Sequence, residues 1–214
     1  MNDFLKLKNL PDETVLEIIE KVSNQFEFMG EKLPKEKSEF IDLFLKHEIK
    51  DSVTFFGGSF NPIHQGHKEC LRLCPEKNIV IVLDRNPHKE FREINLLKEL
   101  QTIVSEFQLT PYSIYPGFWI SNKTNPTSEW ITRVNVPEVN LLMGDDSFFN
   151  FFTWKNPEVI LKKIKKLYVV LRNHHHSELI DKLNSCKKIN LNLEVIFLDG
   201  NKFKDLSSSS IRQK

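Results

Sequence analysis

Short apolar runs alternate with helical stretches from residue 52 to near the end of the chain. Five runs are almost continuously apolar and are predicted to be buried strands, at residues 52–56, 78–83, 139–143, 166–171 and 193–198. The stretches between them predict helices near residues 65–74, 92–107, 157–164 and 177–185. Apolar strands separated by helices are typical of a parallel sheet with helices on both faces. The sequence therefore predicts an α/β fold whose ligands bind at the carboxyl ends of the strands, after Phe56 and Met143.

The first 50 residues follow a different pattern and are predicted to form a helical N-terminal appendage on a domain at 51–214. Pro11, Asp12 and Glu13 favour a helix start. Apolar residues then recur at helical spacing, at Val15, Leu16, Ile18, Ile19 and Val22. A second helix is predicted from Pro34, with a broad apolar face made of Phe40, Ile41, Leu43, Phe44 and Leu45. We expect the appendage to pack on the domain that follows it.

Composition narrows the class of protein. The chain has 214 residues, of which 40% are hydrophobic and 28% charged, with a formal net charge of +1. These values are typical of a globular protein and argue against a general nucleic-acid binder. No window approaches the roughly 18 apolar residues of a membrane span, and the first residues lack a secretory signal pattern. Cys70, Cys74 and Cys186 fit a reducing compartment. We therefore expect a cytoplasmic protein with no membrane or nucleic-acid partner.

The segment GGSFNPIHQGH, at residues 57–67, carries most of the candidate chemistry. It follows a predicted strand and opens a predicted helix, where backbone N–H groups form an anion site. Gly57 and Gly58 let a ligand approach the backbone, and His64 and His67 are spaced to face the same side. Two imidazoles beside an anion site suit donation to phosphate oxygens. A glycine pair can also be only a tight turn, and a histidine pair half of a metal site, but no Cys, Asp or Glu stands beside it at ligand spacing.

The same segment matches the G-x-F-x-P-x-H-x-G-H signature of the nucleotidyltransferase superfamily, and the chain resembles the nicotinate/nicotinamide mononucleotide adenylyltransferases within it. Residues 86–89 resemble the family's P-P-H-K segment, residues 143–147 its G-A-D-S segment with T-W following at 153–154, and residues 206–212 its I-S-S-T-x-I-R segment. Asp145 stands where the family usually has alanine, and Ser209 where it has threonine. Residues 125–128 match the family's P-S-Y-T segment loosely. The resemblance spans about residues 52–212 and leaves the appendage unassigned.

The resemblance implies a Rossmann-like core and a defined reaction. The phosphate of nicotinate or nicotinamide mononucleotide attacks the α-phosphorus of ATP, which gives the dinucleotide and pyrophosphate in NAD biosynthesis. The implied partners are thus ATP and a pyridine mononucleotide. Mg²⁺ is expected to arrive with ATP, and no protein metal site is expected. Whether the chain forms a homo-oligomer, and whether it prefers the acid or the amide mononucleotide, stays open.

The resemblance also implies roles for individual residues. The catalytic residues would be His64, His67 and Arg212, with the imidazoles donating to the α- and β-phosphates and the guanidinium holding the leaving pyrophosphate. The ATP-binding residues would be Gly57, Gly58, Ser59, Phe60, Gly144, Asp146, Ser208 and Ser209. The mononucleotide-binding residues would be Asn61, Lys89, Thr127, Ser128 and Trp154.

Several alternatives remain. The acceptor of an adenylyl or cytidylyl group can be another phosphorylated metabolite, or the chain can be a non-catalytic nucleotide-binding protein. Trp154 can be plain core packing, Lys89 a solvated charge and Asp146 a helix cap. His174, His175 and His176 suggest a metal site, but they are taken to have no acidic or Cys partner at close spacing, so an exposed loop is favoured. Cys70 and Cys74 are expected to be buried small hydrophobes rather than a zinc or redox pair.

Overall fold

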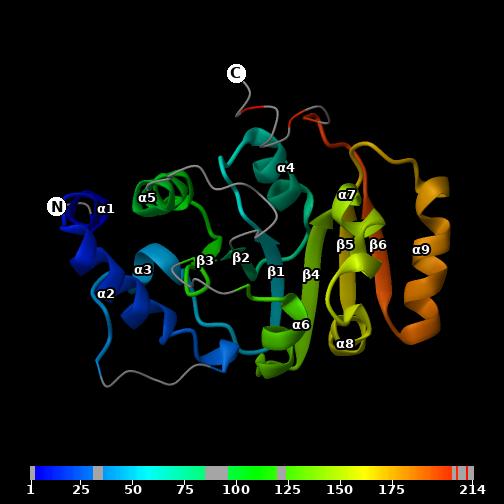
Figure 1. Cartoon of the computed structure of the whole chain (residues 1–214), viewed down its shortest axis with the longest axis horizontal. Helices are drawn as coiled ribbons and strands as arrows, with labels where there is room; N and C mark the ends of the chain where they lie inside the picture. The colour runs from blue at the N-terminus through cyan, green and yellow to red at the C-terminus, as the bar shows by residue number, and fades with distance from the viewer. Residues whose placement is uncertain are drawn as a thin grey trace.

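A six-stranded sheet forms the centre of the molecule (Figure 1) in the computed structural model, which describes residues 3–30, 36–84, 96–119, 124–203, 206 and 211. The strand order is β3-β2-β1-β4-β5-β6. The strands are β1 (Ser52–Gly58), β2 (Ile79–Leu83), β3 (Ser113–Tyr115), β4 (Glu138–Gly144), β5 (Lys166–Val170) and β6 (Glu194–Leu198). Every neighbouring pair is parallel, which confirms the predicted fold class.

The five predicted strands are all present, and four of them are buried as their apolar runs indicate, whereas no residue of the edge strand β6 is buried. Every residue of β2 is buried, as are the central residues of β1 and β4. The sixth strand, β3, was not predicted. It has only three residues at one edge of the sheet, and three residues are too few to show a periodicity.

The long helices also agree with the prediction. They are α4 (Gln65–Leu73), α5 (Leu96–Phe107), α8 (Pro157–Lys163) and α9 (His176–Ile189). Because parallel strands are joined by right-handed crossovers, α4 and α5 cover one face of the sheet and α8 and α9 the other. Four short helices near the ends of β4 were not predicted: α6 (Thr127–Trp130), η2 (Ile131–Arg133), α7 (Asp145–Phe149) and η3 (Phe151–Thr153).

The described part of the first 50 residues packs beside β3 and α5 (Figure 1). Its helices are α1 (Asp3–Lys8), α2 (Asp12–Ser23), η1 (Glu27–Met29) and α3 (Ile41–Phe44). The helix expected from Pro11 is confirmed as α2. The second expected helix was wrong, because only the single turn α3 forms among the described residues 36–44. Tertiary contacts override the helical pattern there: Ile41, Leu43 and Phe44 are all buried, and the chain leaves α3 extended. The Lys46 N–H then donates to the Ser113 hydroxyl at 3.1 Å, on β3.

The N-terminal helices and the sheet share one hydrophobic core. The Phe26 ring, with no exposed surface, meets Tyr115 of β3 edge-on at 5.2 Å between centroids. The Phe28 ring lies 6.4 Å from that of Phe55 in β1. Because the N-terminal helices and the sheet share this core, the domain boundary between residues 50 and 51 stays a prediction. In the described ranges, no helix has the length and apolar character needed to cross a membrane.

The sheet order fixes where a ligand can bind. From β1 the chain winds outward through β2 and β3, and from β4 it winds the opposite way through β5 and β6. β1 and β4 are neighbours, so the winding direction changes between them. A crevice opens at the carboxyl ends of the strands at such a switch point. The segments after Phe56 and Met143, which the sequence indicated, both lie at this position.

Candidate active site

The turn after β1 places the signature residues at the end of the strand. Gly57 has open space where a Cβ would stand, whereas a Cβ on Gly58 would lie 3.1 Å from the Phe60 ring. Phe60 has a φ of 43°, in the left-handed region, and the Asn61–Pro62 peptide bond is cis. The turn thus folds the buried Phe60 ring back under Gly58 and leaves the Gly57 backbone facing open space.

His64 and His67 stack on each other where α4 begins. Their ring centroids are 3.7 Å apart and their planes differ by 26°. The His64 backbone N–H donates to Nδ1 of His67 at 3.3 Å, so a neutral His67 carries its proton on Nε2. A Cβ on Gly66 would lie 3.0 Å from the His64 ring, so glycine at this position allows the ring to pack against the helix start. The spacing therefore brings the two rings together at the helix start.

Protonation of His64 is opposed by its surroundings. Burial lowers the pKa of His64 to about 4, and the positive charge of Arg172 acts in the same direction. The side chain is 7% exposed, and its Nδ1 has no hydrogen-bond partner among the described residues. His64 is therefore neutral at physiological pH. Of the two stacked rings, only that of His67 faces the cleft described next.

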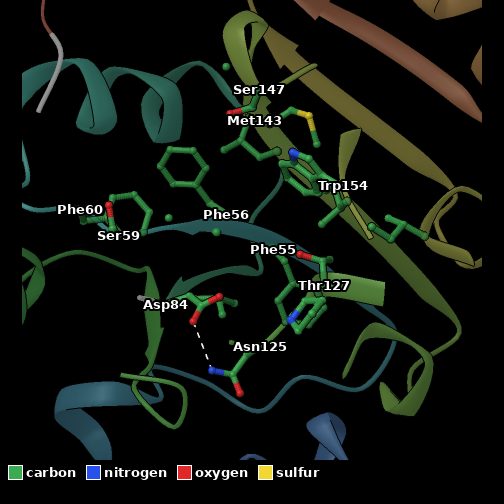
Figure 2. A pocket seen from close by; sticks show the side chains of 18 of the residues that line it. Phe55, Phe56, Ser59, Phe60, Asp84, Asn125, Thr127, Met143, Ser147 and Trp154 are labelled. Atoms are coloured by element: carbon green, nitrogen blue, oxygen red, sulfur yellow. Dashed lines mark hydrogen bonds between the residues drawn. The ribbon is translucent and has the colours of Figure 1, made fainter. Parts of the chain in front are cut away.

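A cleft of about 730 Å³ opens at the switch point, within the range typical of small-molecule sites. Figure 2 shows its side chains converging from several elements, with Trp154 and Met143 on one side and Asp84 on the other. Nine residues that the sequence proposed for substrate contacts line this cleft: Gly57, Gly58, Ser59, Phe60, His67, Thr127, Gly144, Asp146 and Trp154. Residues from three distant parts of the chain thus share one space.

Three other proposed residues do not line the cleft, and four lie outside the described residues. Asn61, His64 and Ser128 are described but are not among the lining residues. His64 lies against His67, and Ser128 is 6% exposed. Lys89, Ser208, Ser209 and Arg212 lie outside the described residues, so their proposed roles remain predictions.

Arg172 is a lining residue that the sequence reading missed. It lies just past the end of β5, and its Nη2 donates to the Leu206 carbonyl. A Cβ on Gly144 would lie 3.9 Å from Cδ of Arg172, so the side chain passes over the end of β4. The rule that ligands bind at strand carboxyl ends, applied to β5, would have found it. Arg172 supplies a cation whose planar fork suits phosphate oxygens.

Asp84 and Asn125 also line the cleft and were missed. Asp84 directly follows β2, and the Asn125 Nδ2 donates to its Oδ1 at 3.3 Å, the dashed line in Figure 2. The same rule, applied to β2, would have indicated Asp84. Trp154 is half-buried and tilts against Phe151 at 5.2 Å between centroids, so it both packs on the core and faces the cleft.

One cluster of potential metal ligands occurs among the described residues. Ligand atoms of Asp145, Asp146 and His174 lie within 4.8 Å of one another. The sequence spacing did not indicate these acidic neighbours of His174, which come close in space because the β4–α7 junction approaches the loop after β5. Four backbone N–H groups already donate to Asp145, however, and Nδ2 of Asn173 donates to Asp146 at 3.1 Å. Of the two carboxylates, Asp146 is the one that lines the cleft, and its side chain is half exposed.

The other two histidines of the 174–176 run and the three cysteines have structural roles. His175 and His176 are exposed at the start of α9, and the His176 ring lies 4.3 Å from that of Phe197. Cys70, Cys74 and Cys186 are free and buried, which confirms the expectation for Cys70 and Cys74. Burial raises the pKa of Cys70 to about 12, which makes its thiol inert.

Comparisons with known proteins agree with this geometry. The family model described as cytidylyltransferase-like matches residues 55–214. A Leptospira interrogans protein named "Probable nicotinate-nucleotide adenylyltransferase" is 32% identical over 146 residues, which cover 61% of this chain and 71% of that protein. A protein of the same name from Leptospira borgpetersenii is 33% identical over 135 residues, 55% of this chain and 66% of that protein. The chain thus spans just under two thirds of this second relative.

A solved structure shares the fold. The nicotinic acid mononucleotide adenylyltransferase of Plasmodium falciparum, complexed with APC, aligns with a TM-score of 0.54 and 21% identity over 76% of this chain and 83% of that one. The fold and the cleft define an α/β protein of the nucleotidyltransferase type. The chain belongs to the cytidylyltransferase-like family and, within it, to the nicotinate-nucleotide adenylyltransferases, which confirms the resemblance found in the sequence.

Proposed function

We propose that the chain transfers the adenylyl group of ATP to nicotinate or nicotinamide mononucleotide, giving the dinucleotide and pyrophosphate in NAD biosynthesis. The observation that supports this most directly is that a single cleft combines phosphate-binding and ring-binding groups. The residues proposed to bind phosphate, His67, Arg172 and Gly57, line the same cleft as Trp154 and Thr127, which are proposed to bind the ring. One cleft can then hold a triphosphate and an aromatic acceptor together.

The chemistry needs positioning and charge stabilisation rather than a protein nucleophile, because the acceptor phosphate is itself the nucleophile. His67 Nε2–H would donate to the phosphate oxygens as negative charge develops on the leaving pyrophosphate. Arg172 would neutralise phosphate charge on the β5 side of the cleft. His64 would hold the His67 ring by stacking, and Arg212, with Ser208 and Ser209, would grip the leaving group.

The acceptor would occupy the part of the cleft nearest Trp154. The indole would stack on the pyridine ring, and the Thr127 hydroxyl would bind its carboxylate or amide. Asn61, Lys89 and Ser128 would complete this site as the resemblance implies. Asp84 lies across the cleft from Trp154 (Figure 2), where a carboxylate can accept from ribose hydroxyls.

Mg²⁺ would enter as part of the ATP substrate. Mg²⁺ keeps most of its water and is often held by one or two carboxylates together with substrate phosphates. Asp146, whose side chain is 50% exposed, would meet a water of the hydrated ion. The cytoplasmic location, the absence of nucleic-acid partners and a homo-oligomeric state stay predictions.

An acceptor panel tests the proposal. The chain is incubated with ATP, Mg²⁺ and one of nicotinate mononucleotide, nicotinamide mononucleotide, phosphopantetheine or glycerol phosphate, and pyrophosphate release is measured. Release with a pyridine mononucleotide alone supports the proposal. Pyrophosphate release only with another acceptor would show that the chain uses a different acceptor substrate. ATP binding with no pyrophosphate release for any acceptor would show a non-catalytic nucleotide-binding protein.

A further inference from the structure

Asp145 is buried without exposed surface at the junction of β4 and α7, yet it has no place in the reaction proposed above. A buried carboxylate needs hydrogen bonds to offset the loss of its hydration. Its Oδ1 accepts from the Asp146 N–H at 2.9 Å. Its Oδ2 accepts from three successive backbone N–H groups beyond β5: Arg172 at 2.7 Å, Asn173 at 2.7 Å and His174 at 2.8 Å.

Three successive N–H groups that converge on one point form a nest for an anion. In this chain the nest is filled by the protein's own carboxylate rather than left for a substrate phosphate. The bonds join the loop after β5 to the end of β4, and one of them holds the backbone of Arg172 itself. The position of the Arg172 Cα, and with it the start of its side chain, is therefore set by Asp145.

The Arg172 side chain runs from this anchored backbone into the cleft, passing over Gly144. The same side chain donates to the Leu206 carbonyl, immediately before the serine run at 207–210. We propose that Asp145 is a positioning residue: it holds the loop after β5 so that Arg172 is aimed at the phosphates of the bound nucleotide. This inference rests on the proposed function, and it gives a physical reason for an aspartate at a position where the resembled family usually has alanine.

Asn140 provides a matched control at the opposite end of the same two strands. It is also buried without exposed surface, and its Oδ1 accepts from the Lys166 N–H at 3.0 Å, so it joins β4 to β5 as Asp145 does. It does not line the cleft among the described residues. If Asp145→Ala acted only by weakening the pairing of β4 with β5, Asn140→Ala would therefore change the Kd of ATP and the thermal midpoint in the same way.

The test compares Asp145→Ala, Asp145→Asn and Asn140→Ala in the full chain. Three quantities are measured: the Kd of ATP by calorimetry, the KM of each substrate, and the thermal midpoint. Asp145→Ala is expected to weaken ATP binding roughly tenfold or more, since a misplaced group costs a large part of its binding, while the KM of the mononucleotide changes less than twofold. Asn140→Ala is expected to lower the thermal midpoint and leave the Kd of ATP unchanged.

Asp145→Asn keeps the side-chain volume and one acceptor oxygen. It therefore replaces Asp145→Ala in the measurement of ATP binding if the alanine variant does not fold. A second arm combines Asp145→Asn with Arg172→Ala. If Asp145 acts through Arg172, the double variant binds ATP no more weakly than Arg172→Ala alone.

Additive losses, an unchanged Kd in both Asp145 variants, or an equal loss in Asn140→Ala would overturn the inference. The Kd of ATP is measured without turnover. Wild-type chain that binds ATP but releases no pyrophosphate would thus contradict the proposed function and still test the role of Asp145.

Discussion

The imidazole rings of His64 and His67 stack with their centroids 3.7 Å apart, and only His67 lines the cleft. The two histidines of the signature therefore have different surroundings. His67 meets the nucleotide site, whereas His64 is buried behind it near the positive charge of Arg172. This difference gives each ring its own testable consequence.

His67→Ala should lower turnover by roughly 10²-fold or more, the scale for losing a transition-state hydrogen-bond donor. The thermal midpoint should change little, because the ring is only partly buried. Steady-state pyrophosphate release measures the effect. His176→Ala is the control, since that exposed histidine rests on Phe197 away from the cleft and its removal should leave the rate unchanged. An equal rate in wild type and His67→Ala would remove His67 from the mechanism.

His64 should make the stability of the chain depend on pH. Its pKa is lowered from 6.5 in the unfolded chain to about 4 in the folded chain. Between these values the unfolded chain binds a proton at residue 64 that the folded chain does not, so stability falls as the pH decreases from about 6.5 toward 4. Above pH 6.5 residue 64 adds no pH dependence.

Urea unfolding at pH 7.5 and pH 5 measures this effect. In His64→Gln the loss of stability between the two pH values should be smaller than in wild type, because residue 64 no longer titrates. Equal losses in both proteins would contradict the assignment.

Trp154→Ala should raise the KM of the mononucleotide by roughly tenfold, on the scale of 1–3 kcal/mol for base–aromatic stacking. The KM of ATP should change little, since His67 and Arg172, not Trp154, are the residues proposed to bind its phosphates. Trp154→Phe keeps an aromatic face and should fall between wild type and Trp154→Ala. A larger effect on ATP than on the mononucleotide would place the indole at the adenine instead.

Phe26→Ala should destabilise the whole chain by about 3–5 kcal/mol, the usual cost of emptying a buried phenylalanine site. The reason is that Phe26 has no exposed surface and meets Tyr115, so the N-terminal segment completes the core at the β3 edge. Denaturant unfolding gives the change in free energy, and pyrophosphate release per folded molecule should stay at the wild-type value. A separate unfolding transition for the first 50 residues would instead show an independent unit.

Much of the fold was predictable because buried parallel strands leave continuous apolar runs. β2 and β5 were predicted within one residue at each end, and the switch-point rule then brought Gly57 and Gly144 to one edge of the sheet. α3 was not predictable in the same way. Its apolar residues resemble a helix face, but they are buried against the sheet edge, and this contact is not visible in the local pattern.

The cleft was predictable where a motif marks it and not where single residues contribute. Gly57, His67 and Asp146 belong to segments that resemble a family. Arg172 and Asp84 stand alone after their strands, and only the sheet order shows that these strands flank β1 and β4. Asp145 was noticed only as a departure from the family pattern. Its bonds join residues 27 to 29 positions apart, which no spacing in the sequence indicates.

Following each phosphorus atom of ATP distinguishes adenylyl transfer from any other reaction of the nucleotide. The chain is incubated with nicotinate mononucleotide and ATP labelled either at the α- or at the γ-phosphorus, and the products are separated. Adenylyl transfer is expected to place the α-label in the dinucleotide and the γ-label in pyrophosphate, in equal amounts. Label from the γ-phosphorus in the mononucleotide acceptor, or α-label remaining in ADP or AMP, would contradict it.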